Sequence, residues 1–208
     1  MSRTRVALVL MAISVCGAAL HAQTTLTALE ADIEATVAMT GMPPLTIHGH
    51  YYRSADGRTR EDTPIVSMII NVAAGTVTLL TPMTMEAQVI TMTAPPQGAA
   101  PATGSGFVPF ETGSVEGRSV TKARLNSADG ATRELWTSQD LGLAMFTKVE
   151  TSAFTMTRTL RNVVVHEPDS SVFQIPAGYA VTHPAQVPSI GPASMGLPLT
   201  PGSVLGPH

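Results

Sequence analysis

Residues 29–40 read LEADIEATVAMT, and apolar residues occupy every second position from the leucine to the methionine. Acidic residues or threonine fill most positions between them. A two-residue period is typical of a strand with one buried face. A helix over about residues 24–40 is the alternative, because Leu26, Leu29 and Ile33 would also share a helical face and alanine and glutamate favour helices. We predict a strand, because the two-residue period is unbroken.

The sequence continues to residue 181 in short β-rich runs separated by turn residues. Two Asp-Gly pairs, Asp56-Gly57 and Asp129-Gly130, are typical of tight hairpin turns. The further predicted strands cover residues 45–54, 58–63, 65–72, 76–80, 85–93, 118–125, 133–138, 143–150, 153–160, 162–166 and 172–175, with a single helical turn starting at 168–171. Strands joined by hairpins without alternating helices form antiparallel sheets, and about ten or eleven strands must curl or split into two layers. We therefore predict a mainly β protein built on one curled antiparallel sheet, a half-barrel with little helix.

Three segments are predicted to lie outside this sheet. Residues 1–22 combine two arginines, fifteen uncharged residues and a small-residue end, which is typical of a secretory signal peptide. The uncharged run is shorter than the about twenty residues of a spanning helix, so we expect no transmembrane anchor after cleavage. Residues 94–114 predict a flexible surface loop, and the Pro- and Gly-rich residues 182–208 predict a disordered tail. The folded domain is then residues 23–181, in the periplasm or outside the cell.

Composition excludes several classes of protein. The chain has 208 residues, 13% of them charged, and a formal net charge of −3 without a basic run. Nucleic-acid binding is therefore not expected, because phosphate neutralisation supplies most of that affinity. The single cysteine, Cys16, lies in the predicted signal peptide and excludes an internal disulfide and a cysteine-based zinc site.

Alternation also predicts an apolar face on the sheet. The residues predicted to line it and to contact a ligand are Met85, Ala87, Val89, Trp136, Leu143, Met145, Phe154 and Met156. Such a face needs a cover, since wet apolar surface costs about 25 cal/mol per Å². A second sheet, closure into a filled barrel, or an apolar ligand would each supply that cover.

Motifs for catalysis and cofactors are absent from the sequence. There is no phosphate loop, dinucleotide fingerprint or His-Glu-x-x-His helix, and the Gly-x-Ser-x-Gly elbow of hydrolases is missing too. His48 and His50 share one parity of a predicted strand, but a metal would need His166 or His183 to converge with them. We predict no metal, no cofactor and no enzymatic activity.

Several segments together resemble a family of uncharacterised secreted bacterial proteins. They are YYR at 51–53, DGRTRE at 56–61, GSVEGR at 113–118, RELWTSQDLGL at 133–143 and EPDSSVFQIPAGYAV at 167–181, the last containing a Phe-x-x-Pro-x-x-Tyr pattern. More distantly, the strand pattern of residues 45–181 is similar to the LolA/LolB-like half-barrel superfamily of periplasmic lipoprotein carriers. That resemblance implies a curled sheet that holds acyl chains under helical lids. The Gly/Pro/Ala-rich composition of residues 94–114 departs from such lids, and the resemblance carries over no catalytic residue.

Two functions are compatible with these observations. The first is an exported, non-catalytic envelope protein that binds a lipid or a lipoprotein acyl chain on the concave face of the sheet. The alternative is an envelope interaction or sensor module with a self-packed β core, whose charged hairpin at 56–62 or Pro-rich tail contacts a protein partner.

Overall fold

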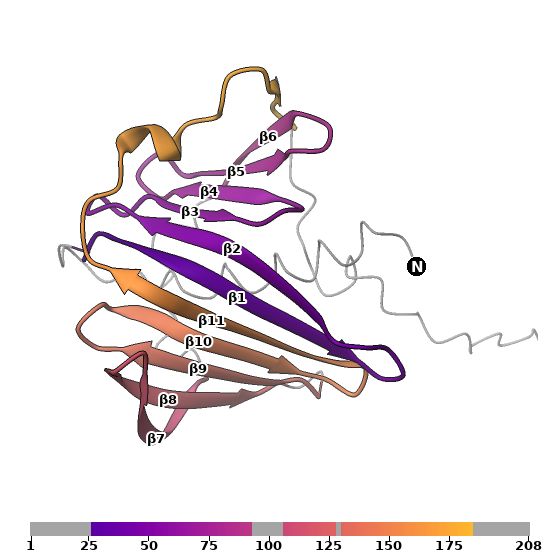
Figure 1. The fold of residues 1–208 in the computed structure, drawn as a ribbon, viewed down its shortest axis with the longest axis vertical. Coiled ribbons are helices and arrows are strands. Elements are labelled where there is room, and N and C mark those ends of the chain that lie inside the picture. Colours follow the sequence, from indigo (N-terminus) through magenta and orange to yellow (C-terminus); the bar gives the residue numbers. More distant parts are fainter. Residues whose placement is uncertain (1–25, 93–105, 128–129, 185–208) are drawn as a thin grey trace, which may run out of the picture.

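The computed structural model describes residues 26–92, 106–127 and 130–184. These residues form one sheet of twelve strands in the order β12-β6-β5-β4-β3-β2-β1-β11-β10-β9-β8-β7 (Figure 1). The strands are β1 Leu29–Met39, β2 Leu45–Arg53, β3 Thr59–Asp62, β4 Ser67–Asn71, β5 Thr76–Thr81, β6 Glu86–Thr91, β7 Val108–Val115, β8 Arg118–Asn126, β9 Thr132–Ser138, β10 Leu143–Glu150, β11 Phe154–Val164 and β12 Ala180–Thr182. A short 3-10 helix, η2, covers Ser170–Phe173. The prediction of a mainly β, largely antiparallel single sheet is confirmed.

β1 lies in the middle of the sheet, between β2 and β11. Buried residues alternate along it with partly exposed ones, as the two-residue period predicts. The helical alternative for this segment is wrong from Leu29 onward. Hydrogen bonding to two antiparallel neighbours outweighs the helix propensity of its alanine and glutamate residues.

Cross-strand register identifies two faces of the sheet, because residues that pair directly point to the same side. We call the side of Ile33 the apolar face and the side of Asp32 the opposite face. The apolar face of β1 consists of Leu29, Ala31, Ile33, Ala35 and Val37, each at most 5% exposed. The first core cluster joins four of these to Tyr51 of β2, Met145 of β10 and Leu160 of β11.

A second core cluster forms on the opposite face, under the C-terminal segment. Phe173 of η2 packs there against Ile69, Leu80 and Ala87 of β4, β5 and β6. Asp169 begins η2, because its carboxylate accepts a hydrogen bond from the backbone N–H of Ser171 at 2.8 Å. The helical turn predicted from residues 168–171 is therefore confirmed. Figure 1 shows η2 beside strands β3 to β5 at one side of the sheet.

The structure differs from the sequence-based prediction in four segments. The strand predicted at residues 172–175 is wrong, because Val172 and Phe173 belong to η2 and no strand follows at Gln174 and Ile175. β7 occupies residues 108–115, where a loop was expected for residues 94–114; its ladder to β8 orders it although most of its side chains are exposed. β12 was not predicted as a strand; its three residues pair with β6 in parallel, and no hairpin signal marks a parallel pair. Residues 154–164 form one strand instead of two, since a bulge at Asn162 (φ 51°) interrupts the pairing with β1 without ending the strand.

The Asp-Gly hairpin at residues 56–57 is confirmed, with Gly57 at φ 88°. Asp129 lies outside the described residues, and so do the predicted signal peptide and the tail from residue 185 onward. Within the described ranges, no helix has the length and apolar character to cross a bilayer.

Candidate functional site

The structure places five of the eight predicted ligand-lining residues on the apolar face or against the first core cluster, in β9, β10 and β11. Met145 is fully buried in the first core cluster, and Leu143 packs against that cluster. Met156 pairs with Val37 on the apolar face and is 1% exposed, while the half-buried Phe154 pairs with Met39.

Three of the predicted lining residues lie elsewhere. Ala87 is buried in the second core cluster, and register places Val89 on the same opposite face. Met85, 43% exposed, precedes β6, and its carbonyl accepts a hydrogen bond from the N–H of Ala180 at 2.8 Å. The predicted set therefore does not form one continuous surface.

Trp136, the last of the predicted lining residues, lies beside Phe146, with the two ring centroids 4.3 Å apart. Both rings pack against the first core cluster, and Trp136 has the parity of Ser138, which pairs with Val120 of that cluster. The ammonium nitrogen of Lys122 lies 4.5 Å from the centre of the indole. This aromatic pair therefore packs at the far end of the sheet from η2, under a lysine.

Polar side chains interrupt the apolar face, which the sequence analysis did not identify. Arg158 of β11 pairs directly with Ala35 of β1 and with Thr147 of β10, so all three share that face. Its guanidinium forms an ion pair with Glu61 of β3, and the two side chains are only 12% and 16% exposed. A signal was present in the sequence: Arg158 has the same parity as Met156 and Leu160, and Thr147 the same parity as Met145 and Val149.

Tyr51 lies next to this ion pair. The guanidinium carbon of Arg158 is 5.5 Å from the centre of its ring. Burial raises the pKa of Tyr51 to about 12, although the nearby positive charges of Arg53 and Arg158 act in the other direction. The phenol therefore stays neutral over the whole physiological range.

Arg53 is a second buried cation on the same face, because it pairs with Leu29 and is 3% exposed. Its guanidinium donates hydrogen bonds to the main-chain carbonyls of Thr27 at 2.8 Å, Leu141 at 2.6 Å and Gly142 at 3.5 Å. Burial lowers the pKa of Arg53. In the described parts of the chain no carboxylate forms an ion pair with it, so its positive charge is satisfied by carbonyl dipoles alone.

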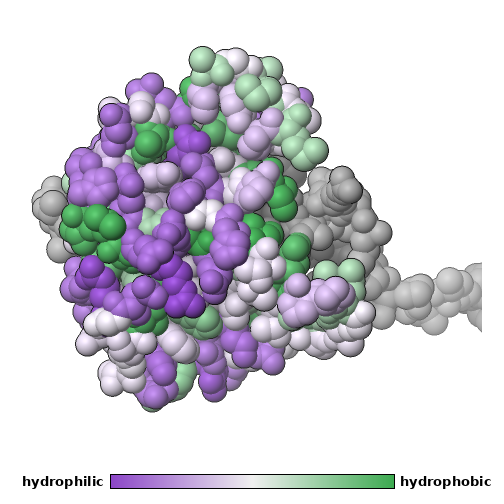
Figure 2. All heavy atoms as spheres, viewed as in Figure 1, coloured by the Kyte–Doolittle hydropathy of each residue, from purple (hydrophilic) through white to green (hydrophobic). Residues whose placement is uncertain are grey.

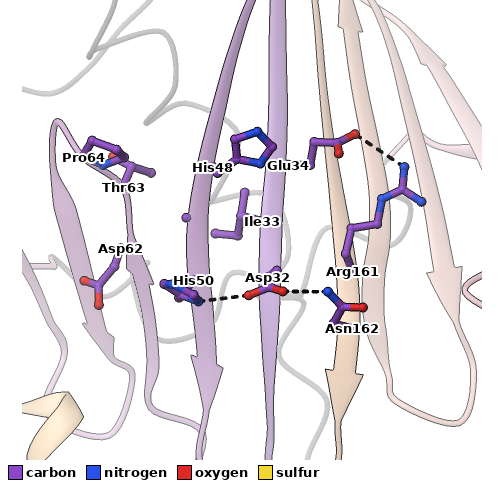
Figure 3. A pocket seen from close by; sticks show the side chains of 11 residues that line it. Asp32, Ile33, Glu34, His48, His50, Asp62, Thr63, Pro64, Arg161 and Asn162 are labelled. Atoms are coloured by element: carbon purple, nitrogen blue, oxygen red, sulfur yellow. Dashed lines mark hydrogen bonds and ion pairs between the residues drawn. The ribbon is translucent and has the colours of Figure 1, made fainter.

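A polar pocket of about 490 Å³ lies on the opposite face, between β2, β1 and β11. Figure 2 shows hydrophilic side chains gathered over the middle of the visible face. In Figure 3, Asp32 stands between its two partners: Oδ1 lies 3.0 Å from Nδ1 of His50, and Oδ2 accepts a hydrogen bond from Nδ2 of Asn162 at 2.8 Å. Beside them, Arg161 contacts Glu34 at 3.4 Å.

This pocket contains His48 and His50, the two histidines considered above as candidate metal ligands. Both are exposed, and the ring of His50 is engaged by Asp32. Across the described ranges, no three His, Cys, Asp or Glu side chains are grouped so that they could hold a metal ion. The hydroxyl of Thr63, which also lines the pocket, donates to the carbonyl of Val66 at 2.7 Å. The pocket therefore offers paired charges and hydrogen bonds, and its lining residues include neither a serine nor a cysteine as a nucleophile.

The charged hairpin at residues 56–62 is used mainly for internal contacts. The guanidinium of Arg58 lies 4.8 Å from the centre of the Phe173 ring, and Arg60 donates to the carbonyl of Val172 at 2.6 Å. Together with the Glu61 ion pair, these contacts attach the hairpin to η2 and to β11. Its charges are thus part of the fold as well as of the surface.

Comparisons with known proteins give a likeness of fold. No protein-family model matches the chain, and no curated protein sequence matches it. An uncharacterised conserved protein from Thermus thermophilus is similar in structure, with a TM-score of 0.55 and 8% identity over 76% of this chain and 91% of that one.

Two further solved structures are more distant. A LolA superfamily protein from Nitrosomonas europaea aligns with 73% of this chain and 92% of its own, at 6% identity and a TM-score of 0.38. The MucA/MucB complex of Pseudomonas aeruginosa aligns at 13% identity and a TM-score of 0.47, and the alignment covers 74% of this chain but only 57% of that chain. The first of these two structures belongs to the LolA superfamily, to which the strand pattern of residues 45–181 is similar, and the likeness is a distant one of fold.

Proposed function

We propose that this chain is a non-catalytic, exported envelope protein that holds an apolar ligand, such as a lipid or a lipoprotein acyl chain, against the apolar face of its sheet. One observation carries the proposal. In the described residues the only elements are one sheet and η2, and η2 packs on the opposite face of that sheet. The chain's own C-terminal segment thus covers the side away from the apolar face.

A curled sheet would make this face concave, and the ion pair between Arg158 and Glu61 supports such a curl. By register, Arg158 is level with Ala35, and Glu61, three strands away, is level with Ala31. In a flat sheet their Cα atoms would lie about 20 Å apart. The two extended side chains and one hydrogen bond reach roughly 15 Å. Their contact is easier to reconcile with a sheet that bends toward the apolar face.

Partly exposed apolar side chains on the β4–β6 part of this face provide surface for a ligand. Ile70, Val77, Leu79 and Ile90 all follow the parity of Met68, which pairs with Glu61. All four are only half-buried. Covering such side chains with an acyl chain is favourable by about 25 cal/mol per Å² of apolar surface removed from water.

Native mass spectrometry and lipid extraction of the purified protein test the proposal. A co-purifying lipid, or stoichiometric uptake of an added acyl chain, is expected. Leu79→Gln, on the apolar face, should weaken uptake, whereas Val89→Gln, half-buried on the opposite face, should not. Protein that stays empty and takes up no acyl chain would refute the proposal, and a loss of uptake confined to Val89→Gln would move the ligand to the other face.

A further inference from the structure

Two buried polar atoms, on neighbouring residues of the apolar face, have no hydrogen-bond partner. They are Nε of Arg158 and Oγ1 of Thr147. The two residues are direct cross-strand partners on β11 and β10, and Thr147 is 8% exposed. They belong to one row across the sheet, with Ala35 on one side and Leu135 on the other.

An unpartnered buried polar group is unusual in a folded protein, because it loses its hydrogen bonds to water and gains nothing in return. Nε of arginine can only donate a hydrogen bond, and a threonine hydroxyl can donate one as well. A ligand oxygen with two free lone pairs could accept both. The geometry of the pair therefore suits an oxygen acceptor placed between β10 and β11.

The charges on this face favour an anionic acceptor. Nη2 of Arg158 forms the ion pair with Glu61, which neutralises one positive charge. Arg53, on the same face, is buried against main-chain carbonyls only. These three ionisable side chains therefore sum to one excess positive charge on a largely apolar face, where its field is weakly screened.

We propose that the site selects an anionic single-chain amphiphile, with a carboxylate oxygen accepting hydrogen bonds from Nε of Arg158 and Oγ1 of Thr147. The half-buried apolar side chains of the β4–β6 part of the same face, Leu79 and Ile90 among them, then contact the tail. This inference rests on the proposed function and adds the class of head group that the apolar face binds.

Paired probes test the head group separately from the tail. Palmitate and 1-hexadecanol have tails of equal length, and only palmitate carries a carboxylate. The delipidated wild-type protein should bind palmitate about tenfold more tightly, the value of one hydrogen bond to a charged group. Equal affinities would overturn the head-group site while leaving acyl binding intact, and failure to bind either probe would overturn the proposed function as well.

Thr147→Val keeps the shape of the side chain and removes its hydroxyl. It should lower the affinity for palmitate several-fold and that for 1-hexadecanol less, because a neutral hydroxyl is the weaker acceptor. It should also raise the unfolding midpoint of the ligand-free protein, because no unpartnered hydroxyl remains. Thr78→Val is the matched control, since Thr78 is also 8% exposed but pairs with Ile69 on the opposite face. An unchanged preference for palmitate in Thr147→Val, or an equal loss in Thr78→Val, would refute the proposed contact.

Discussion

Phe173 connects the C-terminal segment to the sheet, and its replacement by alanine should be among the most destabilising single changes in the chain. The side chain is 8% exposed and packs against Ile69, Leu80 and Ala87. Arg58 lies over its ring, with 4.8 Å between the guanidinium carbon and the ring centre. Burial and the cation–π contact therefore both contribute to docking of η2.

The magnitude follows from these two contributions. Removing a buried phenylalanine side chain costs about 3–5 kcal/mol, which includes the transfer of the ring and the cavity left behind. An exposed cation–π contact contributes about 0.5–1 kcal/mol. We expect Phe173→Ala to lower the free energy of unfolding by about 3–4 kcal/mol, because a single turn at the edge of the core can partly collapse into the cavity.

Phe110 supplies a matched control. Its ring also lies under a guanidinium, with the Arg124 carbon 4.7 Å from the ring centre, but the side chain is 47% exposed. Phe110→Ala removes an equivalent cation–π contact with little burial, so it should cost less than about 1 kcal/mol. The difference between the two variants isolates the contribution of burial.

Urea denaturation measures both variants, followed by far-ultraviolet circular dichroism and by fluorescence of Trp136, which reports the other end of the sheet. Coincident transitions would support a two-state analysis. If Phe173→Ala cost no more than Phe110→Ala, the C-terminal segment would not be docked on the sheet, and the second core cluster would be refuted.

Three further substitutions test the site and its surroundings. Gly49→Ala should lower the free energy of unfolding by about 1–3 kcal/mol, because a Cβ there would lie 2.1 Å from a main-chain carbonyl oxygen of β3. Gly113→Ala is the control, since its Cβ would meet only the end of a flexible lysine side chain. In urea denaturation it should lower the free energy of unfolding by less than half as much. Burial raises the pKa of Tyr51 to about 12, so the unfolded chain loses the phenol proton first, and the free energy of unfolding should fall as pH rises from 10 to 12. Tyr51→Phe should remove about 3 kcal/mol of that fall. An unchanged slope of stability against pH would contradict the burial of the phenol. The hydrogen bond from Arg58 lowers the pKa of Asp56 to about 2, so the ionised carboxylate stabilises the fold above pH 4, and this stabilisation is lost as pH falls toward 2. Asp56→Asn should therefore reduce the loss of stability between pH 4 and pH 2. An identical loss in wild type and variant would contradict this.

Local pattern was sufficient to predict the central strands. β1 shows why: its two-residue period survives because both neighbours pair with it and one face is buried along its length. The Asp56-Gly57 turn was equally predictable, since the backbone at Gly57 needs a positive φ, which glycine adopts readily. Edge strands carry a weaker signal. β7 exposes most of its side chains, so its sequence has no regular alternation of apolar and polar residues from which its pairing with β8 could be predicted.

The candidate site was less predictable, because it depends on which face each strand presents. Met145 and Met156 were identified by parity, but the same parity in β6 leads to Ala87, which is buried on the other side of the sheet under Phe173. Alternation separates the residues of one strand into two faces, but it does not say which of these faces lies on the same side of the sheet as a given face of the next strand. Arg158 was overlooked since a charge in a strand usually indicates the solvated face, whereas here Glu61 compensates it from three strands away.

The second core cluster, on the opposite face, helps to keep the sheet stable when no ligand is bound. A single sheet needs at least one covered face to be stable, and the C-terminal segment covers β4, β5 and β6 from the side away from the apolar face. These strands therefore do not depend on a filled apolar face for their pairing. The sheet can then release a ligand without losing its strands.

Delipidation tests this argument directly. A bound ligand should raise the unfolding midpoint continuously with its free concentration, following the logarithmic dependence for a single site, while the strand signal in circular dichroism stays the same. Combining delipidation with Phe173→Ala should be the condition in which the strand signal is lost, because both faces of β4–β6 then lack a cover. If wild-type protein already lost that signal on delipidation, the opposite-face core would be too weak to hold the sheet, and the ligand would have to be counted as part of the fold.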